Sequence, residues 1–293
     1  MVINRSRIET YLQCHRKYYY TWVKGLVKPV KAEPLRIGST IHRFMEYWYS
    51  NIDMPKEERW KIAWDAALAE LLRDRPPNLP QPGVLYENRL EGFAETLCSR
   101  YVKRYGTSED FAVLQPEVEC DAPLGHGHIL RLRTDAVIER KGKQWILEHK
   151  TTARFGPAFL KKFQLNHQII IYHYGVSSFL KLPIMGVCVN ILIKARDLAH
   201  DYYREWVVIT RAQTRDAIET FTSVADEIQS RDPNEPREWT LNTERCHDYG
   251  ECPFWSVCAL GARAEPDGQL YSLREPDYVD DPTKHDTLPA PAY

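Results

Sequence analysis

In the first third of the chain, apolar and aromatic residues recur every three or four positions, which is the spacing of amphipathic helices. The run from Ile8 to Trp22 predicts a helix over residues 6–23, and Ser6 with Glu9 three positions later has the form of a capping box at its start. Further helices are predicted at 38–50, 56–73 and 86–105.

From residue 109 onward the pattern changes to runs rich in Val, Ile and Tyr, which favour strands. Lys141-Gly142 is a tight-turn signal between two of these runs and predicts a hairpin. The predicted strands are 111–120, 129–140, 143–150, 184–194 and 202–210, and the predicted helices among them are 158–181 and 211–230. This order of elements indicates the α/β class, with a central sheet flanked by helices.

The chain of 293 residues is long enough for one large domain. We expect a single domain over 1–262, with a helical part at 1–108, a sheet core at 109–230 and an irregular segment at 231–262. Residues 263–293 contain five prolines and seven acidic residues, so this tail is expected to be disordered.

Composition narrows the function classes only slightly. Hydrophobic residues make up 43% of the chain, yet no stretch approaches the roughly 20 apolar residues of a membrane span. The first nine residues lack the apolar core of a secretory signal, which favours a cytoplasmic protein without a membrane partner. The formal net charge is -1, but residues 1–31 carry seven basic side chains against one acidic, so a basic end could bind phosphates.

Two carboxylates and an amine fall where two predicted strands meet. Asp135 lies inside an apolar strand pattern, and Glu148 and Lys150 end the next strand. Residues two apart on a strand point to the same face, so Glu148 and Lys150 project together, and the hairpin can bring Asp135 beside them. Carboxylate oxygens suit Mg²⁺ or Mn²⁺, and a nearby lysine can orient or deprotonate a water. Ordinary ion pairs at strand ends would show the same spacing.

Two predicted helices present polar residues at the same interval of four. Gly38, His42 and Glu46 share one face, from which His42 can supply an imidazole to a metal site or simply be a satisfied core histidine. Gln168 and Tyr172 share a face of the helix after the strand that carries Lys150. They could hold a phosphate or a water, or pack their polar ends against the sheet edge.

The seven cysteines form an odd number, which argues against a disulfide scaffold. Cys246, Cys252 and Cys258 are six apart, and three thiolates on one compact segment suit a soft cation, with Cys14 as a candidate fourth ligand. Structural zinc usually has ligands two to four residues apart, which is closer than the spacing here. His247 could nevertheless complete a zinc site, and a segment without any metal is the third alternative. Buried apolar roles are expected for Cys98, Cys120 and Cys188.

These segments, in this order, resemble the PD-(D/E)XK nuclease superfamily, and in particular its RecB-like branch, which includes CRISPR-associated adaptation nucleases and phage exonucleases. The similar segments reach from about residue 3 to 260: Ser6 to Tyr20, Gly38 to Glu46, Asp135 with Glu148 and Lys150, Gln168 to Tyr172, and Cys246 to Cys258. Thr134 replaces the proline of the superfamily's name, and Arg133 and Leu132 stand where the family often has glycine.

The resemblance implies a restriction-endonuclease-like fold and a metal-dependent DNA nuclease. It assigns the divalent metal, Mg²⁺ or Mn²⁺, to Asp135, Glu148, His42 and the backbone carbonyl of His149. Lys150 would act on the attacking water, with Gln168 and Tyr172 also in the catalytic site. It further implies a 4Fe–4S cluster that ties the chain ends together, with zinc as the alternative, held by Cys14, Cys246, Cys252 and Cys258.

The implied activity is that of an exonuclease which hydrolyses DNA from its ends in recombination, repair or phage replication. The alternatives are a structure-specific endonuclease on the same fold and a non-catalytic Fe–S subunit that binds DNA. The expected partner is DNA, single-stranded or with free ends, together with recombination or replication proteins. The aromatic run from Tyr18 to Trp22 suits either single-strand binding or core packing, and Lys161 and Lys162 could face the substrate phosphates.

Overall fold

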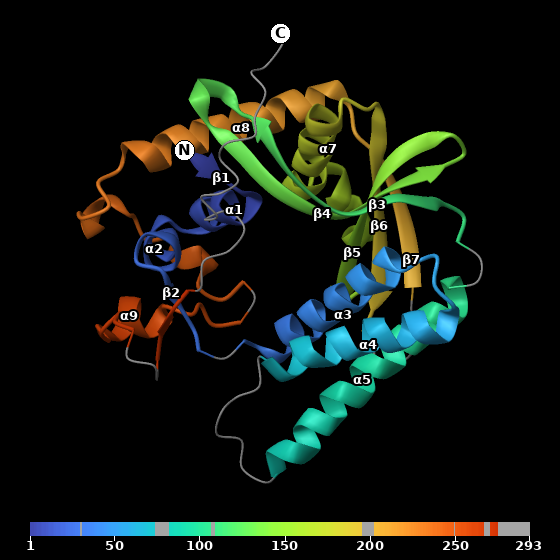
Figure 1. Cartoon of the computed structure of the whole chain (residues 1–293). Helices are drawn as coiled ribbons and strands as arrows, with labels where there is room; N and C mark the ends of the chain where they lie inside the picture. Colours follow the sequence, from blue (N-terminus) through green and yellow to red (C-terminus); the bar gives the residue numbers. More distant parts are fainter. Residues whose placement is uncertain are drawn as a thin grey trace. The chain divides into compact units, whose positions relative to one another are not determined.

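The computed structural model describes residues 1–29, 31–73, 82–106, 109–194, 202–248, 250–266 and 270–274 (Figure 1). The chain divides into two compact units, each assembled from separated segments. The first unit contains Met1–Pro29, Asp121–Leu132 and Thr214–Tyr293, and the second contains Val30–Cys120 and Arg133–Gln213. The boundaries predicted at 108 and 230 therefore do not coincide with those of either unit. Within the described ranges, every helix is too short or too polar to span a lipid bilayer.

The central sheet is mixed, as the sequence predicted. Its strand order is β1-β4-β5-β6-β7, with β3 also paired to β4. The β4–β5 and β6–β7 pairs are antiparallel, whereas β1–β4 and β5–β6 are parallel. The strands are β1 (Val2–Ile3), β3 (Ala112–Pro123), β4 (Ile129–Arg140), β5 (Lys143–Thr152), β6 (Ile184–Ile193) and β7 (Tyr202–Val208).

The hairpin between β4 and β5 turns at the predicted dipeptide. Lys141 and Gly142 have φ of 52° and 69°, which is the left-handed conformation that a two-residue hairpin turn requires at both positions. Paired residues run from Arg140↔Lys143 to Ala136↔Leu147. This register places Asp135 level with Glu148, at the point where the regular pairing ends.

In the second unit, helices cover both faces of β5 (Figure 1). Alternate residues Trp145 and Leu147 pack into a core with Phe44 and Trp48 of α3, which spans Glu33–Ser50. The helices α4 (Lys56–Arg73) and α5 (Pro82–Tyr105) complete that core. On the other face, Glu148 and Lys150 contact α7, which spans His167–Leu180. The period of two along β5 therefore directs alternate residues to two different helical layers.

The prediction of one long helix over 158–181 is wrong. The segment forms α6 (Pro157–Lys161), then the 3₁₀ turn η3 (Lys162–Leu165), and then α7. A new helix begins because the side chain of Asn166 accepts a hydrogen bond from the Ile169 N–H at 3.3 Å, which is the action of an N-cap residue.

The first predicted helix is also divided, into α1 (Arg5–Gln13), α2 (His15–Tyr18) and the π-helix η1 (Tyr19–Val23). The predicted capping box is wrong, because Asn4 caps α1 by accepting from the Arg7 N–H at 2.9 Å, and Glu9 pairs with Arg5. The long helix α8 (Arg211–Ser230) and the short α9 (Trp255–Leu260) follow later in the chain.

The prediction of a disordered tail from residue 263 is wrong for residues 270–274. Ser272–Leu273 form β8, which pairs antiparallel with β2 (Leu26–Val27). Tyr271 is fully buried and stacks on Phe254 with ring centroids 5.3 Å apart. Burial of this aromatic ring offsets the polar composition around it. Residues 267–269 and 275–293 of the predicted tail lie outside the described residues.

Candidate active site

The candidate active site lies where the regular pairing of β4 with β5 ends. Asp135 Oδ2 accepts a hydrogen bond from the backbone N–H of His149 at 2.6 Å. A side chain of β4 rather than a backbone carbonyl thus satisfies this N–H of β5. The Asp135 carboxylate is thereby fixed against the strand that carries Glu148 and Lys150.

The other oxygen of Asp135 faces α3. His42 Nδ1 lies 3.2 Å from Asp135 Oδ1. Gly38, His42 and Glu46 line the same open cavity as Asp135, with a volume of about 830 Å³. Glu46 forms an ion pair there with Arg43, whose Nη1 donates to both carboxylate oxygens, at 2.8 and 2.6 Å.

Glu148, Lys150 and Gln168 form a closed triangle. Lys150 Nζ donates to Glu148 Oε1 and to Gln168 Oε1, and Gln168 Nε2 donates to Glu148 Oε1, each at 2.6 Å. Glu148 is only 3% exposed, whereas the Lys150 side chain is 26% exposed. The lysine is therefore held in place and still accessible. Tyr172 lies one turn beyond Gln168 on α7, and its part in the site remains a prediction.

The charges in this site depend on one another. Burial alone would raise the pKa of Asp135, but the charge and hydrogen bond of His42, together with the His149 N–H, hold it well below its usual range. Burial would likewise lower the pKa of His42, but the charge of Asp135 and their hydrogen bond raise it. Burial raises the pKa of Glu148, and the adjacent Asp135 adds to this effect while Lys150 opposes it.

A polar network that the sequence analysis missed supports His149 from the α3 side. The His149 ring stacks on Tyr49, with centroids 5.6 Å apart, and its Nδ1 lies 2.8 Å from Asn190 Nδ2 on β6. Because an amide nitrogen can only donate, Nδ1 is the acceptor and the imidazole is neutral. Burial is the main reason that the pKa of His149 falls to about 3. The signal in the sequence was Asn190 itself, a lone amide in an apolar strand.

The network continues away from the site. Asn190 Nδ2 also donates to Tyr101 Oη at 2.9 Å, and Tyr101 receives a further bond from Arg204 at 3.1 Å. Arg204 pairs with Glu109 at 2.7 Å, and Tyr49 donates to the same carboxylate at 2.8 Å. Buried polar groups without partners cost about 1–3 kcal/mol each, so the chain of bonds stabilises this arrangement of α3, α5, β6 and β7.

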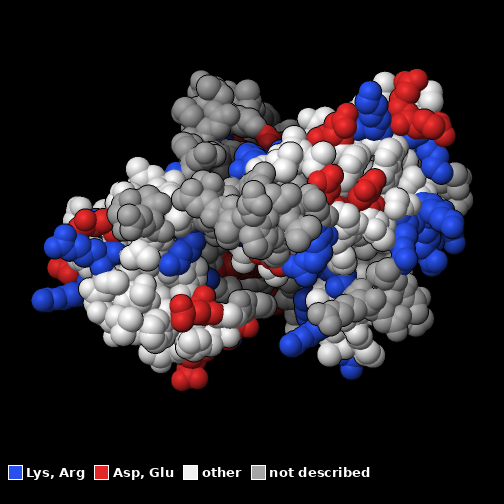
Figure 2. Space-filling view, turned by 90° about the horizontal axis from the view of Figure 1, so that it is seen from below, with Lys and Arg blue, Asp and Glu red and all other residues white. Residues whose placement is uncertain are grey.

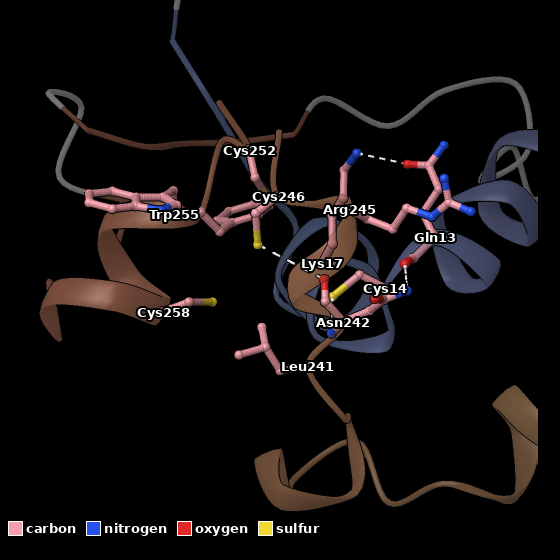
Figure 3. Close-up of a pocket in the computed structure, with 11 residues that line it drawn as sticks. Gln13, Cys14, Lys17, Leu241, Asn242, Arg245, Cys246, Cys252, Trp255 and Cys258 are labelled. Atoms are coloured by element: carbon pink, nitrogen blue, oxygen red, sulfur yellow. Dashed lines mark hydrogen bonds between the residues drawn. The ribbon is translucent and has the colours of Figure 1, made fainter. Parts of the chain in front are cut away.

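The first unit contains a second candidate site. Cys14, Cys246, Cys252 and Cys258 all line one cavity (Figure 3). Figure 3 shows the sulfurs of Cys14, Cys246 and Cys258 turned toward its interior. Its lining also includes the basic side chains of Lys17 and Arg245. The cavity therefore contains all four predicted cysteine ligands, contributed by both ends of the folded chain.

Backbone groups already hold two of these sulfurs. The Asn242 N–H donates to Cys14 Sγ at 3.4 Å, and Cys246 Sγ lies 3.9 Å from the Asn242 carbonyl oxygen (Figure 3). Burial raises the pKa of the Cys252 and Cys258 thiols. All four cysteines are free thiols, so none of them is committed to a disulfide. As expected, Cys98, Cys120 and Cys188 are buried.

Among the described residues, no group of three or more His, Cys, Asp or Glu side chains is already arranged to hold a metal ion. In the candidate active site, both oxygens of Asp135 and Oε1 of Glu148 have hydrogen-bond partners, namely His42, the His149 N–H and Lys150. The donor chemistry nevertheless fits both groups implied by the sequence: carboxylates and an imidazole suit a hard divalent ion, and four thiols suit iron or zinc. Binding would replace the present hydrogen bonds.

The PD-(D/E)XK nuclease superfamily matches residues 3–259, and the chain belongs to this family of nucleases. None of the curated proteins matches the chain in sequence. Among solved structures, an alkaline exonuclease from Laribacter hongkongensis has a TM-score of 0.29 at 13% identity, covering 67% of this chain and 91% of its own. The protein SSO0001 has a TM-score of 0.28 at 13% identity, covering 52% and 72%. These two likenesses are too distant to carry an argument about function.

The opposite pKa shifts of the two histidines predict different titrations in metal-free protein. His42 gains a charged partner on folding, so its ion pair with Asp135 stabilises the fold below pH about 6.5, and this stabilisation is lost as the pH rises through the raised pKa. His149 should stay neutral at pH 4 and above. Histidine NMR spectra recorded against pH should show one ring titrating above pH about 6.5 that disappears in His42→Gln. A His42 resonance that is neutral at pH 6 would contradict this electrostatic description.

Proposed function

We propose that the chain is a Mg²⁺- or Mn²⁺-dependent deoxyribonuclease that acts as an exonuclease on DNA ends. The observation that supports this most is the meeting of Asp135, Glu148 and Lys150 at the parting of β4 and β5, next to an open cavity. Two acids of this kind are needed to hold a hard ion, and an amine beside them is suited to act on water.

In this proposal Asp135, Glu148, His42 and the His149 carbonyl hold the divalent ion, which when bound supplies Lewis acidity at the phosphate and lowers the pKa of a water. Lys150 orients the attacking water or accepts its proton. Gln168 keeps the Lys150 amine beside Glu148 through its two hydrogen bonds. The Tyr172 hydroxyl holds the scissile phosphate or the attacking water. The neutral His149 ring fixes the segment whose backbone contacts Asp135.

The chain carries a formal net charge of only -1, so the molecule as a whole does not attract DNA. Binding must therefore come from contacts at particular positions on its surface. On the face that Figure 2 shows, basic and acidic side chains of the described residues lie side by side. The cavity beside Asp135 follows the same pattern, since Arg43 and Arg133 line it together with Glu46 and Glu117. Phosphates would have to displace these internal ion pairs, which favours binding at specific positions over general attraction.

The exonuclease assignment is supported by the resemblance of the Gln168–Tyr172 helix and the cysteine segments to the RecB-like branch. A structure-specific endonuclease would use the same catalytic groups on internal sites. Digestion of matched linear and closed circular DNA separates the two activities, because an exonuclease degrades only the linear form.

We also propose that Cys14, Cys246, Cys252 and Cys258 hold a 4Fe–4S cluster with a structural role. The four thiols share one cavity, and Lys17 and Arg245 supply positive charge next to the thiolates that a cluster requires. Zinc on the same thiols is the alternative. The cluster would join α1 and α2 to the segment around α9.

Replacement of Lys150 should abolish hydrolysis without unfolding the protein. Lys150→Met keeps the aliphatic stem and removes the amine, so cleavage of end-labelled DNA with Mg²⁺ or Mn²⁺ should fall by about 10²–10⁴-fold, the usual contribution of a proton-transfer group. Lys143→Met, at an exposed position on the same strand, should retain full activity. Equal cleavage rates for Lys150→Met and wild type would contradict the role given to this lysine.

Metal analysis tests the cysteine site. Anaerobically purified protein should contain iron and sulfide in the 4Fe–4S ratio, and Cys252→Ser should lose both and melt at a lower temperature. Cys188→Ala changes a buried cysteine of the other unit and should keep the iron. One zinc per chain without iron would establish the alternative, and wild-type protein free of both metals would refute a cluster of either kind.

A further inference from the structure

Three aromatic side chains form a cluster, of which Phe155 and Phe159 follow β5 and Tyr203 lies on β7. Phe155 lies between Phe159 and Tyr203, with ring centroids at 6.3 and 5.3 Å. Phe155 is 38% exposed and Tyr203 is 40% exposed, so large parts of their rings face solvent. By contrast, Tyr18 and Tyr19 of the aromatic run near the N-terminus are each only 3% exposed and serve packing.

The sheet register places this cluster beside the proposed active site. Lys150 pairs with Ile191 on β6, and Ile191 pairs with Tyr203 on β7. Directly paired residues point to the same face, so Lys150 and Tyr203 project from one face, two strands apart. At about 4.8 Å per strand their backbones are roughly 10 Å apart, about three nucleotides at a stacked spacing of roughly 3.4 Å.

The charge of the surrounding segment suits a nucleic acid. Residues 149–165 contain four basic side chains (Lys150, Arg154, Lys161 and Lys162) and no acidic one. The Lys162 ammonium lies 3.9 Å from the centre of the Phe159 ring. Burial and the charge of Lys150 both lower the pKa of Lys162, so the two amines are within electrostatic range. This segment therefore places positive charge beside the aromatic cluster.

We propose that Phe155 and Tyr203 are a stacking platform for unpaired bases of the strand that is cut, that Phe159 supports the Phe155 ring, and that Lys162 contacts the phosphate backbone of that strand. Exposed rings interleaved with basic side chains are what single-stranded nucleic acid binds, because every base has a face that stacks. Duplex DNA keeps its bases stacked on each other and cannot use the platform. This inference rests on the proposed nuclease function and specifies its substrate as single-stranded or frayed DNA ends.

The platform predicts a selective loss of binding when its exposed rings are removed. The variant is Phe155→Ala combined with Tyr203→Ala, and Phe179→Ala, a 48% exposed phenylalanine on α7 outside the cluster, is the matched control. Fluorescence anisotropy with EDTA present measures binding of a labelled oligothymidine, the same oligomer without bases, and a blunt duplex. Binding of oligothymidine should weaken at least about tenfold, in keeping with measured base–aromatic stacking. The abasic oligomer and the duplex should change less than about twofold.

An equal loss for oligothymidine and the abasic oligomer, or no loss at all, would overturn the platform. Equal losses on oligothymidine and duplex would also overturn it, because the platform acts only on unpaired bases. EDTA prevents cleavage, so the test is separate from the digestions that examine the proposed function. Wild-type protein that cuts DNA while the variant shows no selective loss would refute the platform alone. Wild-type protein that cuts no DNA would refute the proposed function.

Discussion

The hydrogen bond from the His149 N–H to the Asp135 carboxylate is the constraint on which the candidate active site depends. It forms where the pairing of β4 and β5 ends, and it holds an acid of one strand against the backbone of the next. The strand register already places Asp135 level with Glu148, and this bond fixes the orientation of the Asp135 carboxylate. The oxygen of Asp135 that this bond leaves available faces His42 on α3.

The two faces of β5 make different contributions. On the α7 face, Gln168 bonds to both members of the Glu148–Lys150 pair and fixes the amine beside the acid. On the α3 face, the His149 ring is held by Tyr49 and Asn190 and has little freedom to move. The backbone that contacts Asp135 is thus supported on the other face of β5 by a neutral side chain that is stacked on Tyr49 and hydrogen-bonded through Nδ1. A buried network of this kind is stabilising only while every member has its partner.

The sequence was sufficient for the parts of the fold that depend on local pattern. The bounds of β4 and the Lys141-Gly142 turn follow from residue type and alternation, and these two features alone place Asp135 level with Glu148. The break between α6 and α7 was missed, because a continuous apolar pattern outweighed the capping tendency of Asn166. The structure brings His42 and Gln168 to the acids as expected, and their chemical roles remain predictions.

Features that depend on tertiary burial were not accessible from spacing. The run at Tyr18 and the cluster at Phe155 both combine aromatic and basic residues. Only the fold shows that Tyr18 and Tyr19 are buried whereas Phe155 and Tyr203 are exposed. Asn190 gave a signal, as an amide in an apolar strand, but its partners come from α5, β5 and β7 and could not be named in advance. Tyr271 shows the converse, since one buried ring orders a segment of otherwise polar composition.

The central claim is that Asp135 and Glu148 together hold one hard divalent ion. Titration of metal-free protein with Mn²⁺, followed by electron paramagnetic resonance, tests it most directly. We expect one Mn²⁺ site per chain, with an affinity that falls at least about tenfold in Asp135→Asn and in Glu148→Gln, because each variant loses a charged ligand. The affinity should be unchanged in Glu70→Gln, which alters another acid that lines the cavity beside Asp135. Equal Mn²⁺ binding by wild type and Asp135→Asn, or no specific binding by wild type, would contradict it.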